Sequence, residues 1–541
     1  MLRRATLVSI LAAALAAGSA AAAERAAVCT GTCFTAPAGS GPLFLVSGHG
    51  FGHGVGMSQY GAYGYAQHGA TFQQILAHYY PGTTLGPAPP TLFRVLLADR
   101  KKRLTISSEV PFSVRDASRT TVQLPAGSVT FGPGLRLAGR PLTAPLVFSP
   151  GKGGPLTLAR AYRGKISVDV VDGKLRAVNV VGLEQYLYGV VPAEMPAGWS
   201  AEALKAQAVA ARSYALATRN VGAPYDAYSD TRSQMYLGLS AESPSSTAAV
   251  DATKGQVLSY GGKVATTFFY SSSGGQTESS LDWLGSSVPY LISVPDPYDD
   301  ISPYHNWGPV PLTAQAIAKA LKIPGPITDA TTVPNAAGRV AKLNFVTQPA
   351  TVAVSAAALR AAMGLRSTWF SLGIMSLSAP VPSAPVTYGS PLTLSGLVRG
   401  VSGTVTLEER TSGAAWQAVG PVATGQLKLT QRPSITTDYR LATPVAAGAF
   451  VRVRVAPSVQ LSAFTATAVS GSESPVLAGA PVDVQQQNAD GTWTTLVSGP
   501  VAADGTFSLP VSLSSGGTYR VTVGPASGYV AATTAPQIVV R

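Results

Sequence analysis

The chain has 541 residues, enough for two to four domains, and only 12% of them are charged. Its 56 glycines and 41 prolines favour β-rich modules with many loops over helical bundles. The 39 basic residues outnumber the 26 acidic ones, which suits polyanionic surroundings. They are scattered, without a Lys/Arg block interleaved with aromatic residues, and this argues against a nucleic-acid-binding protein.

Residues 1–23 have the layout of a secretory signal peptide. Arg3 and Arg4 precede an apolar stretch that closes on a run of alanines, so cleavage is expected near Ala23. Without these two arginines the chain keeps 37 basic and 26 acidic residues, a net charge of about +11. No other stretch has roughly 18 uninterrupted apolar residues. The sequence therefore predicts an exported, soluble protein without a membrane span.

The only two cysteines, Cys29 and Cys33, come shortly after the expected cleavage site. An oxidising compartment permits a local disulfide between them, which would pin a small loop in the linker of residues 24–42. A lipid-anchored cysteine is the weaker alternative, because the apolar stretch ends well before Cys29. Two thiolates alone would make a poor zinc site.

Residues 48–69, GHGFGHGVGMSQYGAYGYAQHG, carry three of the five histidines. The spacing of His49 and His53 would suit a zinc site if the segment were helical, but the glycines around them argue against a helix. We expect a loop whose backbone approaches its neighbours closely. The apolar residues of 72–79 then recur at three-four spacing, which predicts a short amphipathic helix that ends at Pro81 and Gly82.

Alternating strand-like stretches follow between residues 94 and 181, among them FRVLLA, KISVDVV and LRAVNVV, and they predict a sheet-rich subdomain. The clearest helix of the chain comes next, with Ser200 as its N-cap and Glu202 in its first turn. One face of this helix carries a stripe of mostly small residues, and this stripe predicts close packing against a flat surface. That stripe consists of Leu204, Ala208, Ala211 and Ala215.

The C-terminal half begins with a predicted hairpin across Gly261 and Gly262, followed by helical patterns at 313–322 and 355–363. After about residue 376 the chain consists of short strands punctuated by Gly, Pro and Ser. Two copies of one pattern occur there, in which Trp416 and Arg440 correspond to Trp493 and Arg520. They predict two small immunoglobulin-like β-sandwich modules, 376–460 and 461–541, with the tryptophans in their cores rather than exposed as sugar-stacking platforms.

Glu194 is a candidate catalytic residue from its neighbourhood alone. It lies between Pro192 and Pro196 just ahead of the clear helix, on what we expect to be a stiff turn with apolar neighbours that raise its pKa. A carboxylic acid with a raised pKa can act as a general acid. The alternatives are an exposed turn glutamate or one that caps the helix.

The stretch NVVGLEQYLYGVVPAEMPAGWSAEALKAQAVAARSYAL resembles the core of the stage II sporulation protein D family, a domain shared with bacterial amidase enhancers. AYRG at 161–164, SQMYLG at 233–238, FFYSSSGGQTES at 268–279 and LRAAMGLRSTWF at 359–370 match the same family. So does GHGFGHGVGMSQYGA with its downstream ILAHYYPGT. In the usual family order this Gly/His block closes the domain, whereas here it comes first, so the order looks circularly permuted.

The resemblance implies one α+β, β-rich domain at 43–375, with its Gly/His block at 43–85. It also implies a peptidoglycan lytic transglycosylase that needs no cofactor and uses Glu194 as its only acid and base. The nearest candidates for a second carboxylate are Glu184, Glu202, Asp226 and Asp230, and we expect none of them to be a nucleophile. Expected partners are peptidoglycan strands, acidic wall polymers and a cell-wall amidase.

A substrate cleft around Glu194 needs side chains that hold sugar hydroxyls, acetamido groups and the lactyl carboxylate. Lys205 and Arg212 lie seven residues apart on one predicted helix face and could hold that carboxylate, or form a solvated charged face. The serines and glycines of 271–275 could be a plain turn, and His53 could be structural. The candidate substrate-binding residues are Lys205, Gln207, Arg212, Tyr214, Gln234, Tyr270, Ser271, Ser272, Ser273, Gly274, Gly275, Thr277, His53, Ser58 and Gln59.

Three other readings compete with the transglycosylase. A metal site is not expected, because the segment YSDTRSQMYLG lacks the Cys and His that some relatives carry there. A serine hydrolase built from Ser271, Ser272 or Ser273 with His53 lacks a G-x-S-x-G elbow. The rival of a different class is a non-catalytic wall protein that binds glycan and enhances a partner amidase.

Overall fold

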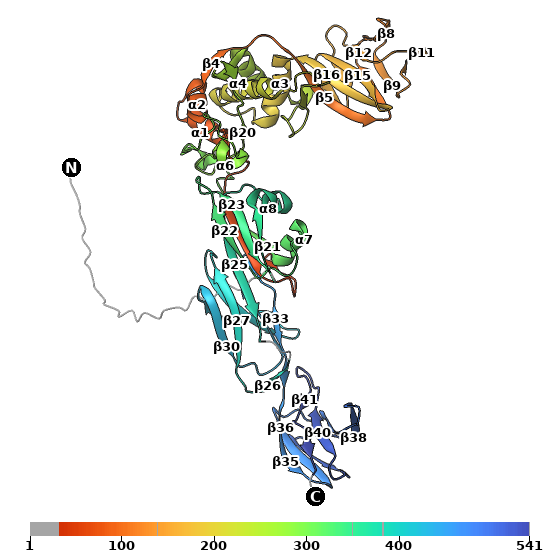
Figure 1. The fold of residues 1–541 in the computed structure, drawn as a ribbon, viewed down its shortest axis with the longest axis vertical. Coiled ribbons are helices and arrows are strands. Elements are labelled where there is room, and N and C mark those ends of the chain that lie inside the picture. Colours follow the sequence, from red (N-terminus) through yellow and green to blue (C-terminus); the bar gives the residue numbers. More distant parts are fainter. Residues whose placement is uncertain (1–31, 138, 349, 381–383, 540–541) are drawn as a thin grey trace, which may run out of the picture. The chain divides into compact units, whose positions relative to one another are not determined.

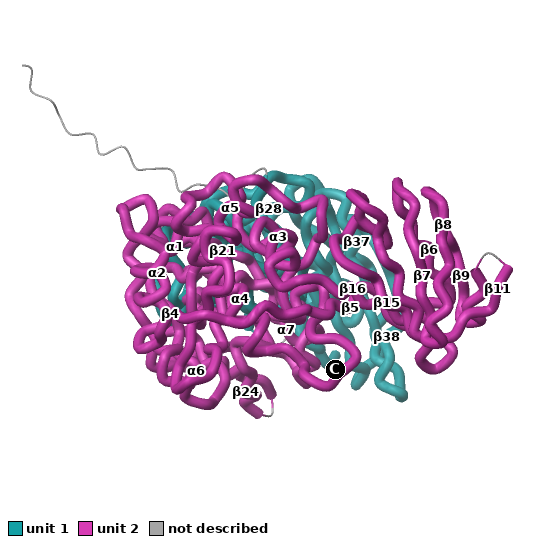
Figure 2. Tube along the Cα trace, turned by 90° about the horizontal axis from the view of Figure 1, so that it is seen from above, with its two compact units in different colours: residues 1–43, 374–541 teal, residues 44–373 magenta. Residues whose placement is uncertain are grey.

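The structure is a computed structural model that describes residues 32–137, 139–348, 350–380 and 384–539. By its internal contacts the chain divides into two compact units (Figure 2), one of residues 44–373 and one of residues 1–43 with 374–541. Both are β-rich, and the helices of the described residues lie in the first of them. The predicted signal peptide and Cys29 fall outside the described residues.

A helical core occupies the middle of the unit 44–373. Its central helix is α4 (Ala201–Thr218), and α3 (Leu183–Glu194), α5 (Pro244–Ala252), α1 (Gln59–Gln67) and α2 (Phe72–Tyr79) contact it. The predicted stripe of small residues on α4 is confirmed, because Leu204, Ala208, Ala211 and Ala215 are all buried in one cluster. Small side chains let the neighbouring helices approach closely. Ser200 is the N-cap residue, but its side chain makes no capping hydrogen bond.

The predicted sheet-rich subdomain is confirmed. A seven-stranded sheet has the order β17-β5-β16-β15-β12-β7-β8, and the long strands β5, β15 and β16 run side by side in Figure 1. A four-stranded sheet, β14-β13-β6-β9, shares its core. Their bounds are β5 Leu92–Lys101, β6 Leu104–Ser108, β7 Phe112–Arg115, β8 Thr121–Leu124, β9 Gly127–Phe131, β12 Leu146–Ser149, β13 Leu156–Leu158, β14 Arg160–Tyr162, β15 Lys165–Val171, β16 Lys174–Gly182 and β17 Ala227–Tyr228.

The Gly/His segment is built into this unit by a strand pairing that spans more than 200 residues. After β2 (Leu43–His49), the short strand β3 (Met57–Ser58) pairs in parallel with β20 (Phe269–Tyr270). The predicted hairpin is confirmed as β18 (Gln256–Tyr260) with β19 (Lys263–Val264), and the short helix α6 spans Ser280–Leu284.

The last part of the unit 44–373 is a small three-stranded sheet with two helices. The sheet has the order β22-β23-β24, with β22 Asp329–Pro334, β23 Val340–Val346 and β24 Thr351–Ser355. Both predicted helices are confirmed, as α7 (Ala314–Leu321) and α8 (Ala356–Met363), and α7 follows β21 (Asn306–Thr313). Thr313 and Ser355 cap the two helices through their hydroxyl groups, as their residue types favour.

The other unit repeats one three-strand arrangement. In the first copy β28 (Val405–Thr411) pairs with β29 (Gln417–Val422) and β31 (Thr437–Ala442). In the second copy β37 (Pro481–Gln487) pairs with β38 (Trp493–Pro500) and β40 (Thr518–Val523). Smaller sheets accompany each copy, with β27 (Leu392–Arg399) and β30 (Gly425–Gln431) in the first and β35 (Ser458–Phe464), β36 (Ala468–Ser474) and β39 (Thr506–Pro510) in the second. Phe34–Thr35, within the predicted linker, forms β1 and pairs with β32 (Ala446–Ala447).

The prediction that Trp416 and Trp493 are core residues is wrong, since both rings are only half-buried. A guanidinium group lies over each of them, that of Arg440 at 4.0 Å from the Trp416 centroid and that of Arg520 at 4.2 Å from the Trp493 centroid. The repeat is therefore real, but the feature it repeats is a cation–π pair on a sheet surface.

Candidate functional site

Glu194 is the last residue of α3, so the predicted turn is instead a helix end that contains Pro192. Pro192 has no N–H, so α3 lacks one main-chain hydrogen bond near its C-terminal end. The half-buried carboxylate of Glu194 accepts a hydrogen bond from the Met235 amide at 2.8 Å. Burial raises the pKa of this carboxyl above its ordinary value, and the hydrogen bond from Met235 opposes part of that shift.

Two tyrosines and a glutamine from different elements lie around Glu194. The Glu194 charge raises the pKa values of Tyr186 and Tyr214, in addition to the larger effect of burial. The Tyr186 hydroxyl donates to Gln234 Oε1 at 3.2 Å, and Gln234 Nε2 donates to the Ala211 carbonyl at 3.3 Å. Of the candidate residues, Tyr214 and Gln234 are thus the two that share the Glu194 neighbourhood.

The four carboxylates considered as second acids are all paired with cations. Their ion pairs are Glu184 with Arg212, Glu202 with Lys205, Asp226 with Arg94, and Asp230 with Arg232. Within the described part of the chain, no cation pairs with Glu194. Burial without a neighbouring cation favours the neutral form of a carboxyl group. Glu194 is therefore better suited to donate a proton than the four paired carboxylates.

Arg212 does not lie on an accessible face, which corrects its prediction as a substrate-binding residue. Its side chain is 0% exposed. The guanidinium bonds both oxygens of Glu184 at 2.6–3.2 Å and also donates to the main-chain oxygens of Gln256 and Val250. With its charge and donors satisfied inside the protein, Arg212 ties α4 to α3 and to the segment after α5.

Lys205 and Gln207 are also engaged in packing rather than in an open cleft. Lys205 Nζ donates to Glu202 at 2.7 Å, and Glu202 in turn accepts from the Phe72 amide at 2.7 Å, which holds the start of α2 against α4. Gln207 is completely buried, and its amide has no hydrogen-bond partner among the described residues.

The serine and glycine residues predicted to bind sugar instead surround a buried carboxylate, that of Asp299. Its Oδ1 accepts from the Ser58 hydroxyl at 2.9 Å and the Ser273 amide at 2.9 Å. Its Oδ2 accepts from the Ser272 hydroxyl at 2.8 Å, the Gly274 amide at 2.8 Å and His305 Nδ1 at 3.2 Å. Because Ser58, Ser272 and Ser273 are buried, their prediction as sugar ligands is corrected to a structural role.

A second buried carboxylate, Asp296, lies beside this network and was missed by the sequence analysis. It is 0% exposed, and its Oδ1 accepts from the Tyr79 hydroxyl at 2.7 Å. Burial, with a smaller contribution from Asp299, raises the pKa of Asp296 to about 6. A Cβ on Gly61 would clash with both Asp296 oxygens, so the glycine of SQYG is required here. The three aspartates of PDPYDD, at residues 295–300, are the feature of the sequence that could have indicated this acidic site.

His53 is held by backbone on both sides of its ring, as the structural alternative predicted. Nδ1 accepts from the Val55 amide at 3.1 Å, so Nε2 carries the proton and donates to the Phe269 carbonyl at 3.2 Å. The ring stacks on Trp283 with centroids 4.6 Å apart. Burial lowers the pKa of His53 to about 4. A His53 ring with both nitrogens occupied is not available as a metal ligand or as a general base.

The remaining candidate residues are mostly internal. Thr277 bonds the main chain of Ile292 and Val294, Gln59 begins α1, and Tyr270 is buried with a hydroxyl that has no partner among the described residues. Gly274 and Gly275 have positive φ angles of 78° and 115°. Ser271 is the exception, because its side chain is half-exposed while its carbonyl accepts from the Tyr60 amide at 3.0 Å.

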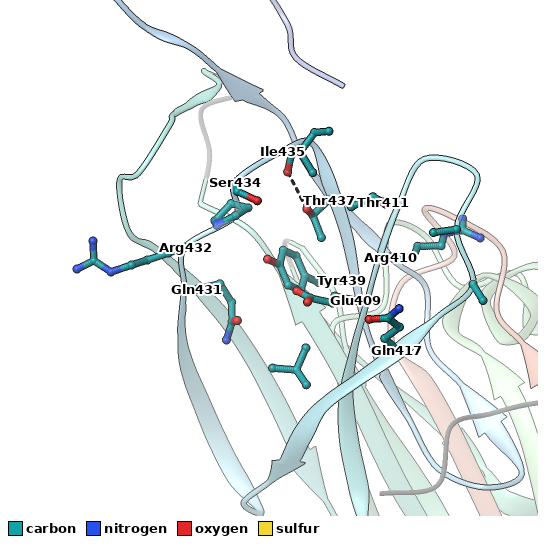
Figure 3. A pocket seen from close by; sticks show the side chains of 14 residues that line it. Glu409, Arg410, Thr411, Gln417, Gln431, Arg432, Ser434, Ile435, Thr437 and Tyr439 are labelled. Carbon is teal, nitrogen blue, oxygen red and sulfur yellow. Dashed lines mark hydrogen bonds between the residues drawn. The ribbon is translucent and has the colours of Figure 1, made fainter. Parts of the chain in front are cut away.

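Two pockets help to place these residues. One of about 370 Å³ has Tyr214 in its lining, together with Asn220, Tyr225, Tyr228 and Ser233. A pocket of about 320 Å³ lies in the first repeat of the other unit, where Figure 3 shows Glu409, Gln417, Gln431 and Tyr439 around it. No candidate residue lines that second pocket, so only the first adjoins the Glu194 neighbourhood.

Other structural findings concern metals, membranes and the disulfide. In the described ranges, no group of three or more His, Cys, Asp or Glu side chains is arranged to hold a metal ion. None of the helices in the described part of the chain is long and apolar enough to cross a membrane. Cys33 is disulfide-bonded, and its predicted partner Cys29 lies outside the described residues.

Comparisons with known proteins point to the elements that hold Glu194. Residues 171–260 match the SpoIID family model, described as stage II sporulation protein. A stretch of 113 residues is 48% identical to an amidase enhancer of Bacillus subtilis and covers 21% of this chain and 15% of that protein. An uncharacterized protein of Brachyspira hyodysenteriae is 39% identical over 136 residues, which cover 25% of this chain and 37% of that protein.

Stage II sporulation protein D of Bacillus subtilis is 33% identical over 155 residues, which cover 26% of this chain and 45% of that protein. The chain thus spans less than half the length of these relatives. Among solved structures, the FN1–FN3 domains of chicken CNTN1 align with 37% of this chain and 74% of their own at 12% identity, with a TM-score of 0.12, from which no fold follows. The matched region contains α3, α4, α5 and Glu194, so this part of the chain is similar to the SpoIID family.

Proposed function

We propose that the chain is a peptidoglycan lytic transglycosylase that cleaves between N-acetylmuramic acid and N-acetylglucosamine and leaves a 1,6-anhydro end. The observation that carries the proposal is the environment of Glu194. Its carboxylate is half-buried, accepts one main-chain hydrogen bond and lacks a cation within the described residues, and burial raises its pKa. Such a group can be protonated before the reaction and ionised after it.

In the first step, neutral Glu194 donates its proton to the glycosidic oxygen as the bond to muramic C1 breaks. The sugar that leaves gains a hydroxyl, and positive charge develops at C1 and the ring oxygen. In the second step, the muramic C6 hydroxyl attacks C1, and the Glu194 carboxylate takes the hydroxyl proton. The ring closes to the 1,6-anhydro form, and Glu194 is again neutral, so the cycle consumes no water.

The pairing of the neighbouring carboxylates supports a mechanism with one acid. Ordinary glycosidases use two carboxyl groups on opposite sides of the bond. Here Glu184, Glu202, Asp226 and Asp230 are each neutralised by a cation, so none is a free nucleophile or base. The Met235 amide keeps the carboxylate in place when it is charged, and Tyr214 lines the adjoining pocket.

Mass spectrometry of released sugars tests the proposal. Residues 24–541, their Glu194→Gln variant and a Glu109→Gln control, which changes an exposed glutamate, are each incubated with intact and with peptide-stripped peptidoglycan. Anhydro-muramic ends from the parent and the control but not from Glu194→Gln would support the proposal. Release by Glu194→Gln at the parental rate would contradict it.

A second candidate function is favoured by one of the similar proteins. The relative named an amidase enhancer is 48% identical over 113 residues, so a non-catalytic role beside a cell-wall amidase is the alternative proposal. In that case the parent and Glu194→Gln would release no sugar, would bind peptidoglycan equally, and would raise the rate of an added amidase equally. We further propose that the protein is exported to the cell wall and that its repeated β modules act as anchors or spacers.

A further inference from the structure

A chain of ring contacts connects the loop after Glu194 to an exposed arginine. Trp199 lies in the connection between α3 and α4, five residues beyond Glu194. Its ring contacts that of Tyr60 at a centroid distance of 4.8 Å, Tyr60 contacts Tyr304 at 6.2 Å, and Tyr304 contacts Phe51 at 5.1 Å. We call these four residues together with Arg366 the aromatic–arginine strip.

The rings of the strip pack against neighbouring side chains on one side and remain partly exposed on the other. Tyr63 stacks on Trp199 with centroids 4.6 Å apart and planes at 7°, so one face of the indole is fixed against α1. Trp199, Tyr60 and Tyr304 are half-buried, and Phe51 is 37% exposed. Aromatic rings held this way lose little freedom when a ligand packs on them.

Arg366 ends the strip with an exposed positive charge. Its guanidinium lies 4.5 Å from the Tyr304 centroid and 5.7 Å from that of Phe51, and its carbonyl accepts hydrogen bonds from the Gly52 amide and from Arg360 Nε. Within the described residues, no carboxylate pairs with Arg366 or Arg360. By contrast Arg339 is buried and pairs with Glu278. Burial and, to a smaller extent, the positive charge of Arg339 lower the pKa of Arg360.

The Arg366 guanidinium, 4.5 Å from the Tyr304 centroid, carries N–H groups in a fork that matches a carboxylate. The neighbouring rings offer apolar faces of the size of a sugar ring, and the strip begins at Trp199, in the connection that follows α3 and Glu194. Neutral glycans would use only the rings. A glycan that carries carboxylates would use both the rings and the unpaired charge.

We propose that the aromatic–arginine strip is a binding arm for the glycan strand beyond the cleavage point, in which Arg366 holds a carboxylate of the ligand. The inference rests on the proposed function, because it takes peptidoglycan as the ligand at Glu194. The carboxylate has two sources in that polymer, the lactyl group of peptide-free muramic acid and the acidic groups of stem peptides. Both present the same chemistry to a guanidinium.

Binding measurements on the full chain carrying Glu194→Gln test the inference without turnover. The probes are peptide-stripped glycan strands, peptide-bearing strands and neutral N-acetylglucosamine oligomers. Arg366→Gln is compared with Lys319→Gln, which removes an exposed charge from α7 of the same unit. Phe51→Ala is the second variant, and the unfolding midpoints of all variants are recorded.

We expect Arg366→Gln to weaken binding of carboxylate-bearing strands about tenfold, as loss of a charged hydrogen bond does. Neutral oligomers should bind it as they bind the parent, Phe51→Ala should weaken all three probes, and Lys319→Gln should change none. An effect confined to stripped strands assigns the lactyl carboxylate, and an effect confined to peptide-bearing strands assigns the stem peptide. Unchanged binding of all strands to Arg366→Gln overturns the inference.

Failure of the inference and failure of the proposed function give different results. If the parent releases anhydro sugars while both strip variants bind like Glu194→Gln alone, the strip has no role and the enzyme proposal stands. If the strip variants lose binding while the parent releases no sugar, the binding arm stands and the enzyme proposal falls. If Glu194→Gln and the parent bind no strand, both are overturned.

Discussion

The carboxylate of Glu194 and the main-chain amide of Met235 meet at 2.8 Å, although 41 residues separate them in the chain. The contact joins the end of α3 to the loop that follows β17, so the acid is held by the fold and not by its own helix alone. The donor is the main-chain amide of Met235, which stays in place when the side chain of residue 194 is changed. The activity of a Glu194 variant therefore measures the loss of the carboxyl group itself.

The first prediction concerns the pH dependence of cleavage. Burial raises the pKa of Glu194, so the group stays protonated, and active as an acid, to a pH above its ordinary value of 4.5. We expect the basic limb of the kcat/KM profile to lie above pH 4.5 and the same limb to appear in Glu109→Gln. A limb at or below pH 4.5 would show that another group controls the reaction.

The second prediction concerns the buried pair of Arg212 and Glu184. Replacement of Arg212 by Met leaves a largely buried carboxylate without its cation and should lower the free energy of unfolding by about 3 kcal/mol. Arg232→Met is the control, because Arg232 and its partner Asp230 are 61% and 46% exposed and such pairs contribute under about 1 kcal/mol. Urea unfolding measures both. Equal midpoints for the two variants would contradict the structural role of Arg212.

The third prediction separates Ser271 from Ser272. Ser272→Ala removes a hydroxyl that bonds the buried Asp299 at 2.8 Å and should cost about 1 to 3 kcal/mol of stability. Ser271→Ala, at a half-exposed position, should change stability by less than about 0.5 kcal/mol. Thermal unfolding and glycan binding are measured for both. If Ser272→Ala keeps its unfolding temperature but loses glycan binding, Ser272 binds the glycan and its structural role is wrong.

The fourth prediction concerns Asp296 and the pH dependence of stability. The pKa of this carboxyl is raised from 3.8 to about 6 in the folded protein, so its neutral form stabilises the fold at low pH. That contribution is lost as the pH rises from about 4 through 6, at a cost of about 3 kcal/mol. Asp296→Asn keeps an acceptor for Tyr79 and cannot ionise, so the variant should gain stability relative to the parent across this range.

His53 titrates over the same pH range with the opposite sign, and the comparison must separate the two groups. The pKa of His53 is lowered from 6.5 to about 4, so stability due to His53 is lost as the pH falls through this range. The difference between Asp296→Asn and the parent cancels the His53 contribution, because both proteins carry it. A difference that does not change between pH 4 and 7 would contradict the raised pKa of Asp296.

Elements with a strong local pattern were predictable from the sequence. β15 covers the same seven residues, KISVDVV, that alternate in the sequence, and the stripe of small residues on α4 is buried as its spacing indicates. The family model covers residues 171–260, so the family motifs at 161–164 and 359–370 stay predictions. The predicted permutation of the domain order is not tested by these observations and stays a prediction, as do the domain boundaries.

The network around Asp299 could not be predicted, because its parts lie far apart in the chain. Ser58 and Asp299 are 241 residues apart. No local pattern in the sequence indicates that a serine-glycine turn will donate hydrogen bonds to a distant carboxylate. Arg212 was misassigned for a related reason. Helical spacing places it on the same face as Lys205, but the partner that buries it, Glu184, comes from α3.

The pairing of β3 with β20 also bears on when the chain can fold. The contacts of His53 with Phe269 and of Ser58 with Asp299 join segments 216 and 241 residues apart, so these two contacts cannot form until residues 269 and 299 have been synthesised. Contacts of such long sequence separation make folding slow. The Gly/His segment therefore reaches its final contacts only after most of the unit 44–373 has been synthesised.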